Sequence, residues 1–226
     1  MKNRPVLFAA GAVGLIIVLA VAWYLASPLF INRTVDEAFP FELPGQAELD
    51  AMSEDEMKAL EAEFMAAVPS EDELNAMPAD TRAEVEEQVM ASAAAVMSDK
   101  VMVEEMPATA AEATILAQGR FVGADSFHQG SGNAAIYELP DGSRVLRFED
   151  FTVTNGPDLH VILTRHPAPA SRSDVGEDYV DLGQIKGNVG NQNYDIPTDV
   201  DLSQYRGVVI YCKPFHVVFA TATLDQ

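Results

Sequence analysis

The chain has a single cysteine, Cys212, in 226 residues. One cysteine excludes a disulfide within the chain, so packing alone has to stabilise the fold. Basic residues are also scarce, because 14 lysines and arginines stand against 35 aspartates and glutamates, for a net charge of −21. This acidic excess argues against binding nucleic acid, which needs a basic surface to displace the counterions of its phosphates.

Several signatures of enzymes and cofactor sites are missing from the chain. It has no phosphate-binding P-loop, no dinucleotide fingerprint and no CxxCH motif for covalent haem. The serine in "GSGN" (130–133) lacks the strand–turn–helix context of a hydrolase nucleophile. Nothing in the sequence therefore indicates a nucleotide-dependent enzyme or a serine hydrolase.

Residues 1–33 predict a membrane anchor. Residues 5–32 contain no charged side chain. This uncharged stretch is longer than the about 20 apolar residues that a helix needs to cross a bilayer. The basic residues before this stretch predict a cytoplasmic N-terminus. We therefore expect a single-pass protein of the cell membrane, inserted through residues 6–30, with the remainder periplasmic or at the cell surface. The small residues Ala20–Ala22 leave a cleaved signal peptide as the alternative.

Residues 34–116 predict an acidic helical stalk or linker. The repeats "SEDEMKAL" (53–60) and "SEDELNAM" (70–77) each place a serine three residues before a glutamate, which is the capping box of a helix start. A third helix is expected from about Asp80. Because short helices are marginal in water on their own, the segment is either a solvated spacer or an arm that binds a partner.

Residues 117–226 predict an all-β domain. About eight short apolar runs alternate with turn signals such as Asp141-Gly142, a pattern typical of a β-sandwich or a barrel-like fold. The runs "GVVIYC" (207–212) and "HVVFATA" (216–222) alternate little between apolar and polar residues, which indicates burial on both faces. We expect them to form a central hairpin whose turn contains Pro214, since proline cannot donate to a ladder.

The same region resembles a known family. It shares a series of motifs in one order, namely the Gly119–Phe121 opening, His128 with Gly130 and Gly132, "FEDF" (148–151), "GPDL" (156–159), "LGQIKGNVGNQNYDIP" (182–197) and the terminal "IYC" (210–212). Together these are similar to the DM-thirteen domain, a small electron-transfer domain that accompanies DOMON domains in animal proteins and stands alone in bacterial ones. The resemblance implies a β-sandwich whose cysteine, here Cys212, is redox-active, either as a bare thiol or as a thiolate that holds a group such as haem.

The residues around Cys212 leave three roles open. In the first role Cys212 is a buried structural thiol, because free cysteine packs as a small hydrophobe. In the second it is a redox thiol, whose pKa Lys213 or His216 lowers and whose exchange a redox partner protein or small reductant completes. In the third it is a copper ligand together with His216 and His160, although no methionine follows Met106 to serve as the axial ligand. The cofactor is therefore unknown at this point: none, copper or haem.

These observations predict a membrane-anchored, extracytoplasmic protein that performs electron transfer or thiol redox chemistry through Cys212. The alternative is a non-catalytic interaction or adhesion module of the cell envelope with a structural, buried cysteine. Whether the protein is an enzyme stays open. The remaining histidines, His128 and His166, are expected to be ordinary hydrogen-bonded residues.

Overall fold

The structure is a computed structural model that describes residues 40–107 and 112–225. All of them belong to one compact unit, Phe39–Gln226. The predicted membrane segment, residues 6–30, lies outside the described residues. Among the helices of the described ranges, none combines the length and the apolar character that a membrane crossing requires.

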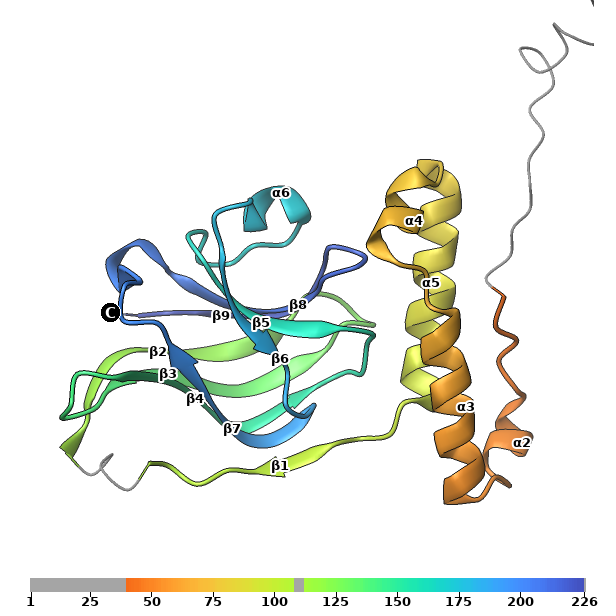
Figure 1. The fold of residues 1–226 in the computed structure, drawn as a ribbon, viewed down its shortest axis with the longest axis horizontal. Helices are drawn as coiled ribbons and strands as arrows, with labels where there is room; N and C mark the ends of the chain where they lie inside the picture. The colour runs from red at the N-terminus through yellow and green to blue at the C-terminus, as the bar shows by residue number, and fades with distance from the viewer. Residues whose placement is uncertain (1–39, 108–111, 226) are drawn as a thin grey trace, which may run out of the picture. The chain divides into compact units, whose positions relative to one another are not determined.

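Within residues 40–107 four helices precede the β domain, and we refer to residues 46–97 as the helical arm. The capping boxes predicted at Ser53 and Ser70 are both present, with each serine and its partner glutamate bonded to the other's backbone amide. The helices are α2 (Gln46–Leu49), α3 (Glu54–Ala67), α4 (Glu71–Ala76) and α5 (Ala79–Val96), and α3 lies alongside α5 (Figure 1).

The narrow apolar faces of these helices are buried rather than solvated. Phe64, Leu74 and Val89 are each almost fully buried, and they belong to the same hydrophobic cluster as the core of the β domain. Asn155 of the β domain also donates its amide to the carbonyl oxygen of Met97, over 2.9 Å. The arm therefore derives its stability from packing on the β domain, which short helices of this kind need.

The β domain is one curled, nine-stranded sheet that forms a half-barrel (Figure 1). Its strand order is β1-β7-β4-β3-β2-β9-β8-β5-β6, and every neighbouring pair is antiparallel except β1 and β7. The strands are β1 (Val101–Val103), β2 (Thr114–Gly123), β3 (Gly130–Glu138), β4 (Arg144–Val153), β5 (Leu159–Thr164), β6 (Val180–Gln184), β7 (Val189–Ile196), β8 (Gly207–Cys212) and β9 (Val217–Thr223). Two short helices, α6 (Arg172–Val175) and η3 (Leu202–Gln204), lie in the connections.

The expectation of a mostly β domain is confirmed, and of the two predicted forms the structure has the barrel-like one, a single continuous sheet and not a two-sheet sandwich. The reason lies in β2, which pairs with β3 up to Arg120 and with β9 from Phe121 onward. A strand that changes partners in this way turns a corner between two halves of a sheet. The first strand, β1, lies within residues 34–116, where the sequence predicted a helical stalk. Its three residues are too few to form a strand pattern that could be recognised.

The core of the half-barrel is aromatic. Phe148 is fully buried and lies 4.8 Å from Phe121, 4.9 Å from Phe151 and 5.2 Å from Tyr194, measured between ring centroids. Gly132 sits at a break in the β3–β4 register with φ +112°, and a Cβ there would lie 2.6 Å from the Cα of Phe151. Only glycine suits that position, since the backbone is left-handed and the opposite strand is in contact.

The predicted central hairpin is confirmed. Strands β8 and β9 are antiparallel neighbours with β5 on one side and β2 on the other, and Pro214 lies in the turn between them. This turn places Cys212 at the end of a buried strand, directly beside the β8–β9 connection.

Candidate functional site

Cys212 is the last residue of β8 and faces the core of the half-barrel. It stands opposite Leu159 of β5 and Val217 of β9. Its side chain has no exposed surface and belongs to the main hydrophobic cluster with Ile210 and Val208, the residues two and four positions earlier in the strand. The neighbouring Tyr211 belongs to a separate cluster on the opposite face of the sheet.

The thiol of Cys212 is protonated at neutral pH in this arrangement. Burial raises its pKa to about 12, and a backbone hydrogen bond from Phe215 opposes this only in part. The sulfur donates a hydrogen bond to the carbonyl oxygen of Pro157, over 3.0 Å. Because the thiolate is the reactive form of cysteine, the sulfur is chemically quiet while it stays covered.

Two segments that cover the sulfur each contain a strained residue. Asp158, directly after Pro157, has φ 49°, and His216 in the β8–β9 turn has φ 57°. The two segments are joined by a hydrogen bond from the Lys213 amide to the carbonyl oxygen of Asp158, over 3.3 Å. Left-handed backbone at residues other than glycine is rare, and it is concentrated in switch regions and functional sites.

His216 connects the turn to the helical arm. Its Nε2 lies 3.1 Å from Oε1 of Glu71 in α4, and its Nδ1 lies 3.2 Å from the hydroxyl of Tyr211. Burial lowers the pKa of His216, and the nearby Arg172 lowers it further. Both ring nitrogens are engaged away from Cys212, so this imidazole does not activate the sulfur as the sequence allowed.

Lys213 is also committed elsewhere. Its ammonium group lies 3.0 Å from Oδ2 of Asp181 in β6, and this hydrogen bond raises its pKa. The same aspartate accepts from Nδ1 of His160 over 2.8 Å, while Nε2 of His160 lies 3.2 Å from Oδ1 of Asp158. The result is a network of polar and acidic side chains with Lys213 on the face of the sheet opposite Cys212.

The structure does not bring the three candidate copper ligands together. His160 stands opposite Tyr211 in the β5–β8 pairing, so its side chain lies on the face that Cys212 avoids. Across the part of the chain that is described, no group of three histidine, cysteine or acidic side chains is placed to hold a metal ion. Copper therefore does not fit this arrangement, and neither does haem, because the sulfur is fully buried and its hydrogen bond goes to the carbonyl oxygen of Pro157.

Comparison with known families agrees with the motifs. Residues 121–224 match the family model described as electron transfer DM13. The C-terminal domain is a DM13 domain. The match covers only the end of β2, from Phe121, and all of β3–β9, and it contains Cys212, whereas β1 and the helical arm lie outside it. Comparisons with curated proteins and with solved structures gave no match.

The DM13 domain also pairs a buried histidine, His128, with an exposed aspartate, Asp125, which the sequence did not reveal. Nδ1 of His128 lies 2.8 Å from Oδ2 of Asp125, whose Oδ1 accepts from the backbone amides of Phe127 and His128. The ring packs edge-on against Phe219, and its Nε2 is buried without a hydrogen-bond partner in the structure. The spacing Asp-x-x-His is the only signal that could have pointed to this pair.

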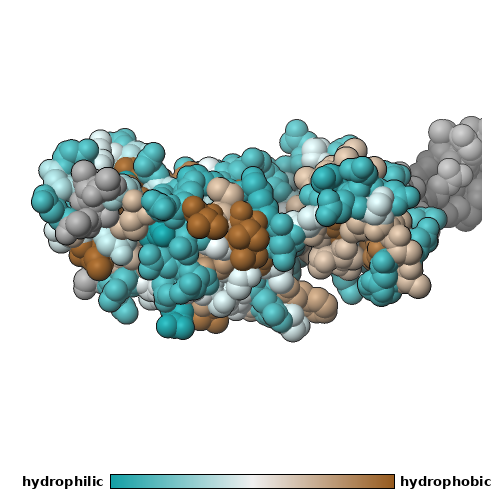
Figure 2. All heavy atoms as spheres, turned by 90° about the horizontal axis from the view of Figure 1, so that it is seen from below, coloured by the Kyte–Doolittle hydropathy of each residue, from teal (hydrophilic) through white to brown (hydrophobic). Residues whose placement is uncertain are grey.

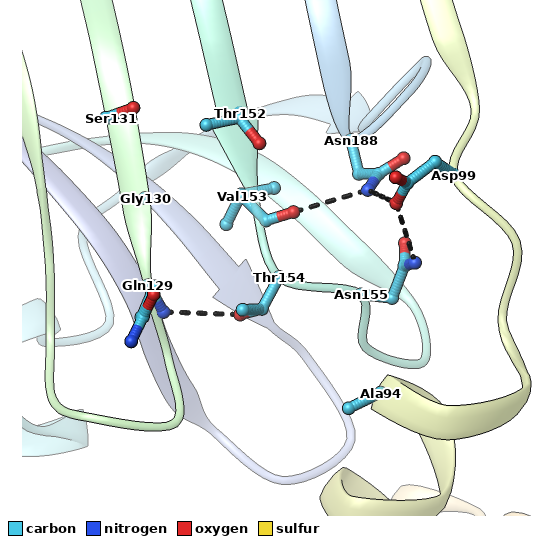
Figure 3. A pocket seen from close by; sticks show the side chains of 10 residues that line it. All are labelled: Ala94, Asp99, Gln129, Gly130, Ser131, Thr152, Val153, Thr154, Asn155 and Asn188. Carbon is cyan, nitrogen blue, oxygen red and sulfur yellow. Dashed lines mark hydrogen bonds between the residues drawn. The ribbon is translucent and has the colours of Figure 1, made fainter.

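A polar cavity of about 390 Å³ lies between the helical arm and the DM13 domain (Figure 3). Asp99 accepts hydrogen bonds there from the side-chain amides of Asn188, over 2.7 Å, and Asn155, over 3.4 Å. The other lining residues come from α5, from the start of β3 and from the end of β4, and they are Ala94, Gln129, Gly130, Ser131, Thr152, Val153 and Thr154. Since Cys212 does not line this cavity, it offers no route to the sulfur.

Proposed function

We propose that this protein is a membrane-anchored, extracytoplasmic electron-transfer or thiol-redox protein, with Cys212 as the redox centre of its DM13 domain. The observation that carries the proposal is the match of residues 121–224 to a family described by electron transfer. Cys212 is the only cysteine in the chain and lies inside that match. The uncharged stretch over residues 5–32 supports the anchor and the extracytoplasmic location.

In this proposal the covered thiol is a resting state. The strained residues Asp158 and His216 flank the sulfur, and the Glu71–His216 contact ties the turn to the arm. Release of the arm would free the turn and admit water to Cys212. Solvation would then lower the pKa of the thiol toward its ordinary value, because burial is the main cause that raises it.

The exchange itself needs a partner, because the chain has no second cysteine. Once exposed, the thiol of Cys212 loses its proton to water, and the thiolate attacks a disulfide of a partner protein or small molecule. A mixed disulfide forms, and the other sulfur of the partner leaves as a thiolate. A thiolate of a dithiol reductant then attacks the sulfur of Cys212 in the mixed disulfide, and the partner's remaining sulfur leaves as a thiolate. The second thiol of the reductant closes the reductant's own disulfide and releases Cys212, so that two electrons and two protons pass from the dithiol to the partner's disulfide.

The test uses the full chain and a small aromatic disulfide reagent. We expect slow reaction of the native protein and faster reaction of Leu74→Ala, because truncating this buried leucine of α4 weakens the arm's packing by about 2–5 kcal/mol. Met65→Ala is the matched control, since Met65 is an exposed residue of the arm. Cys212→Ser should melt near the wild-type temperature but not react. A thiol that stays inert in Leu74→Ala contradicts the gated redox role.

One observation favours the alternative of a non-catalytic interaction module. The sulfur of Cys212 is fully buried and hydrogen-bonded to Pro157, as expected of a thiol that serves only to fill the core. This alternative predicts that Cys212→Ser keeps every binding property of the protein. It also predicts no difference in thiol reactivity between Leu74→Ala and Met65→Ala.

A further inference from the structure

The two edges of the nine-stranded sheet differ in how they are protected. The β6 edge has a register break against β5, and Gly183 within it has φ 104°. It also carries Asp181, whose carboxylate is bonded to His160 and Lys213. Bulges and charged side chains of this kind are common devices against pairing with another chain. The β1 edge has neither a bulge nor a charged side chain within its three residues.

In β1 the backbone amide and carbonyl groups of every second residue point away from β7. Val189 donates to the carbonyl oxygen of Lys100, and Glu104 donates to that of Asn191, so residues 100, 102 and 104 bond toward β7. The amide and carbonyl groups of Val101 and Val103 therefore point away from the sheet.

The side chains on this edge are apolar and exposed. Val101 is 63% exposed and Val103 is 80% exposed. Figure 2, which views the molecule from below relative to Figure 1, shows apolar side chains gathered at the middle of the visible surface, over β1. The edge is also held in place, because Glu104 at its end accepts from the Lys186 ammonium, over 2.8 and 3.0 Å, and from the Asn193 amide, over 2.8 Å. An edge fixed in advance loses little entropy when it pairs.

The sequence of this edge is complementary to itself. Residues 100–104 read Lys-Val-Met-Val-Glu. When two copies pair antiparallel about Met102, each Lys100 stands opposite Glu104 of the other copy, and each Val101 stands opposite Val103. A shift of the register by one residue in either direction breaks both matches, so charge and apolar contact select the same alignment.

We propose that β1 is a self-association edge, at which two copies of this chain join their sheets by antiparallel pairing centred on Met102. The outward groups of Val101 and Val103 then exchange four backbone hydrogen bonds with the second copy, and four valine side chains cover one another. Stable interfaces bury about 1,200–2,000 Å², and a three-residue junction is much smaller, so the dimer should be weak and reversible. The proposal is independent of the redox role of Cys212.

The first experiment measures the mass of the full chain in mild detergent by sedimentation equilibrium over a range of concentrations. We expect a reversible monomer–dimer equilibrium whose association constant falls at least about tenfold in Val103→Lys, since a charged side chain would then stand opposite Val101 of the second copy. Val122→Lys is the matched control, because Val122 is 66% exposed but lies on the interior strand β2. A chain that is monomeric throughout, or a dimer weakened equally by both changes, overturns the proposal.

A second experiment tests the register. Cα atoms of hydrogen-bonded antiparallel pairs are about 5.5 Å apart, which a disulfide spans, whereas positions displaced by two residues are about 7–8 Å apart. A mixture of Val101→Cys and Val103→Cys chains should therefore form the mixed disulfide faster than either variant cross-links to itself. Val122→Cys chains should form none. Equal cross-linking of all the combinations contradicts the proposed alignment even if the chain dimerises.

Discussion

The chemical state of Cys212 can be tested by alkylating the native and the unfolded chain with iodoacetamide at the same pH. Only the thiolate reacts, so the rate reports the pKa of the sulfur and its access to solvent. Because the chain has one cysteine, the mass of the intact protein counts the reaction directly. The unfolded chain, in urea, supplies the reference rate.

The magnitude follows from the burial of the thiol. With its pKa raised to about 12, about one Cys212 side chain in 10⁴ is a thiolate at pH 8. An ordinary thiol with a pKa of about 8.5 is about one quarter thiolate at that pH. We therefore expect the native chain to react about 10³-fold more slowly than the unfolded chain, before any further loss from steric cover.

The dependence on pH gives an independent check. The rate for the native chain should rise about tenfold per pH unit up to at least pH 10, whereas the rate for the unfolded chain should level off near pH 9. A native rate within about tenfold of the unfolded rate at pH 8 would refute the picture of a sealed thiol, because that difference corresponds to only one pKa unit. It would mean that the cover over Cys212 opens readily.

Three further predictions concern stability. Phe148→Ala should lower the free energy of unfolding by about 3–5 kcal/mol in a denaturant titration, because it empties the aromatic core, whereas Val122→Ala should change it by less than about 0.5 kcal/mol. Ser70→Ala should cost about 1 kcal/mol by removing the cap of α4, and faster hydrogen exchange in α4 should reveal it; an unchanged exchange rate there would show that the cap is dispensable. Burial acts to raise the pKa of Glu104, but hydrogen bonds from Lys186 and a backbone amide outweigh it, so the pKa is lowered. The stabilisation by Glu104 is therefore present above the pKa of the unfolded chain and is lost as the pH falls through the lower pKa of the folded chain. In Glu104→Gln the free energy of unfolding should therefore fall less steeply with decreasing pH below pH 4.5.

Features that depend on neighbours in the chain could be predicted from the sequence. The capping boxes at Ser53 and Ser70 and the β8–β9 hairpin appear in the structure where they were expected. Each depends on residues within a few positions of one another, so a short pattern contains all of the information that is needed. The resemblance to the DM13 family also came from the sequence, because its motifs keep their order along the chain.

Features that depend on distant pairing could not be predicted in the same way. Strand β1 has three residues, and its partner β7 begins 88 positions later, at Val189. The change of partners along β2, which decides between a two-sheet sandwich and one curled sheet, is likewise invisible in any local pattern. The roles of Lys213, His216 and His160 were open for the same reason, since their partners belong to other elements.

The sequence alone determined where the helix starts, the turns and the strands other than β1 lie, that no disulfide can form within the chain, and that Cys212 ends a strand buried on both faces. The tertiary structure decided which groups surround that sulfur: a carbonyl oxygen and hydrocarbon, with the side chains of Lys213 and His216 bonded elsewhere. The physical reason is that side-chain direction and burial set the reactivity of a thiol. Both depend on strand register and on segments packed from other parts of the chain, which no local stretch of sequence encodes.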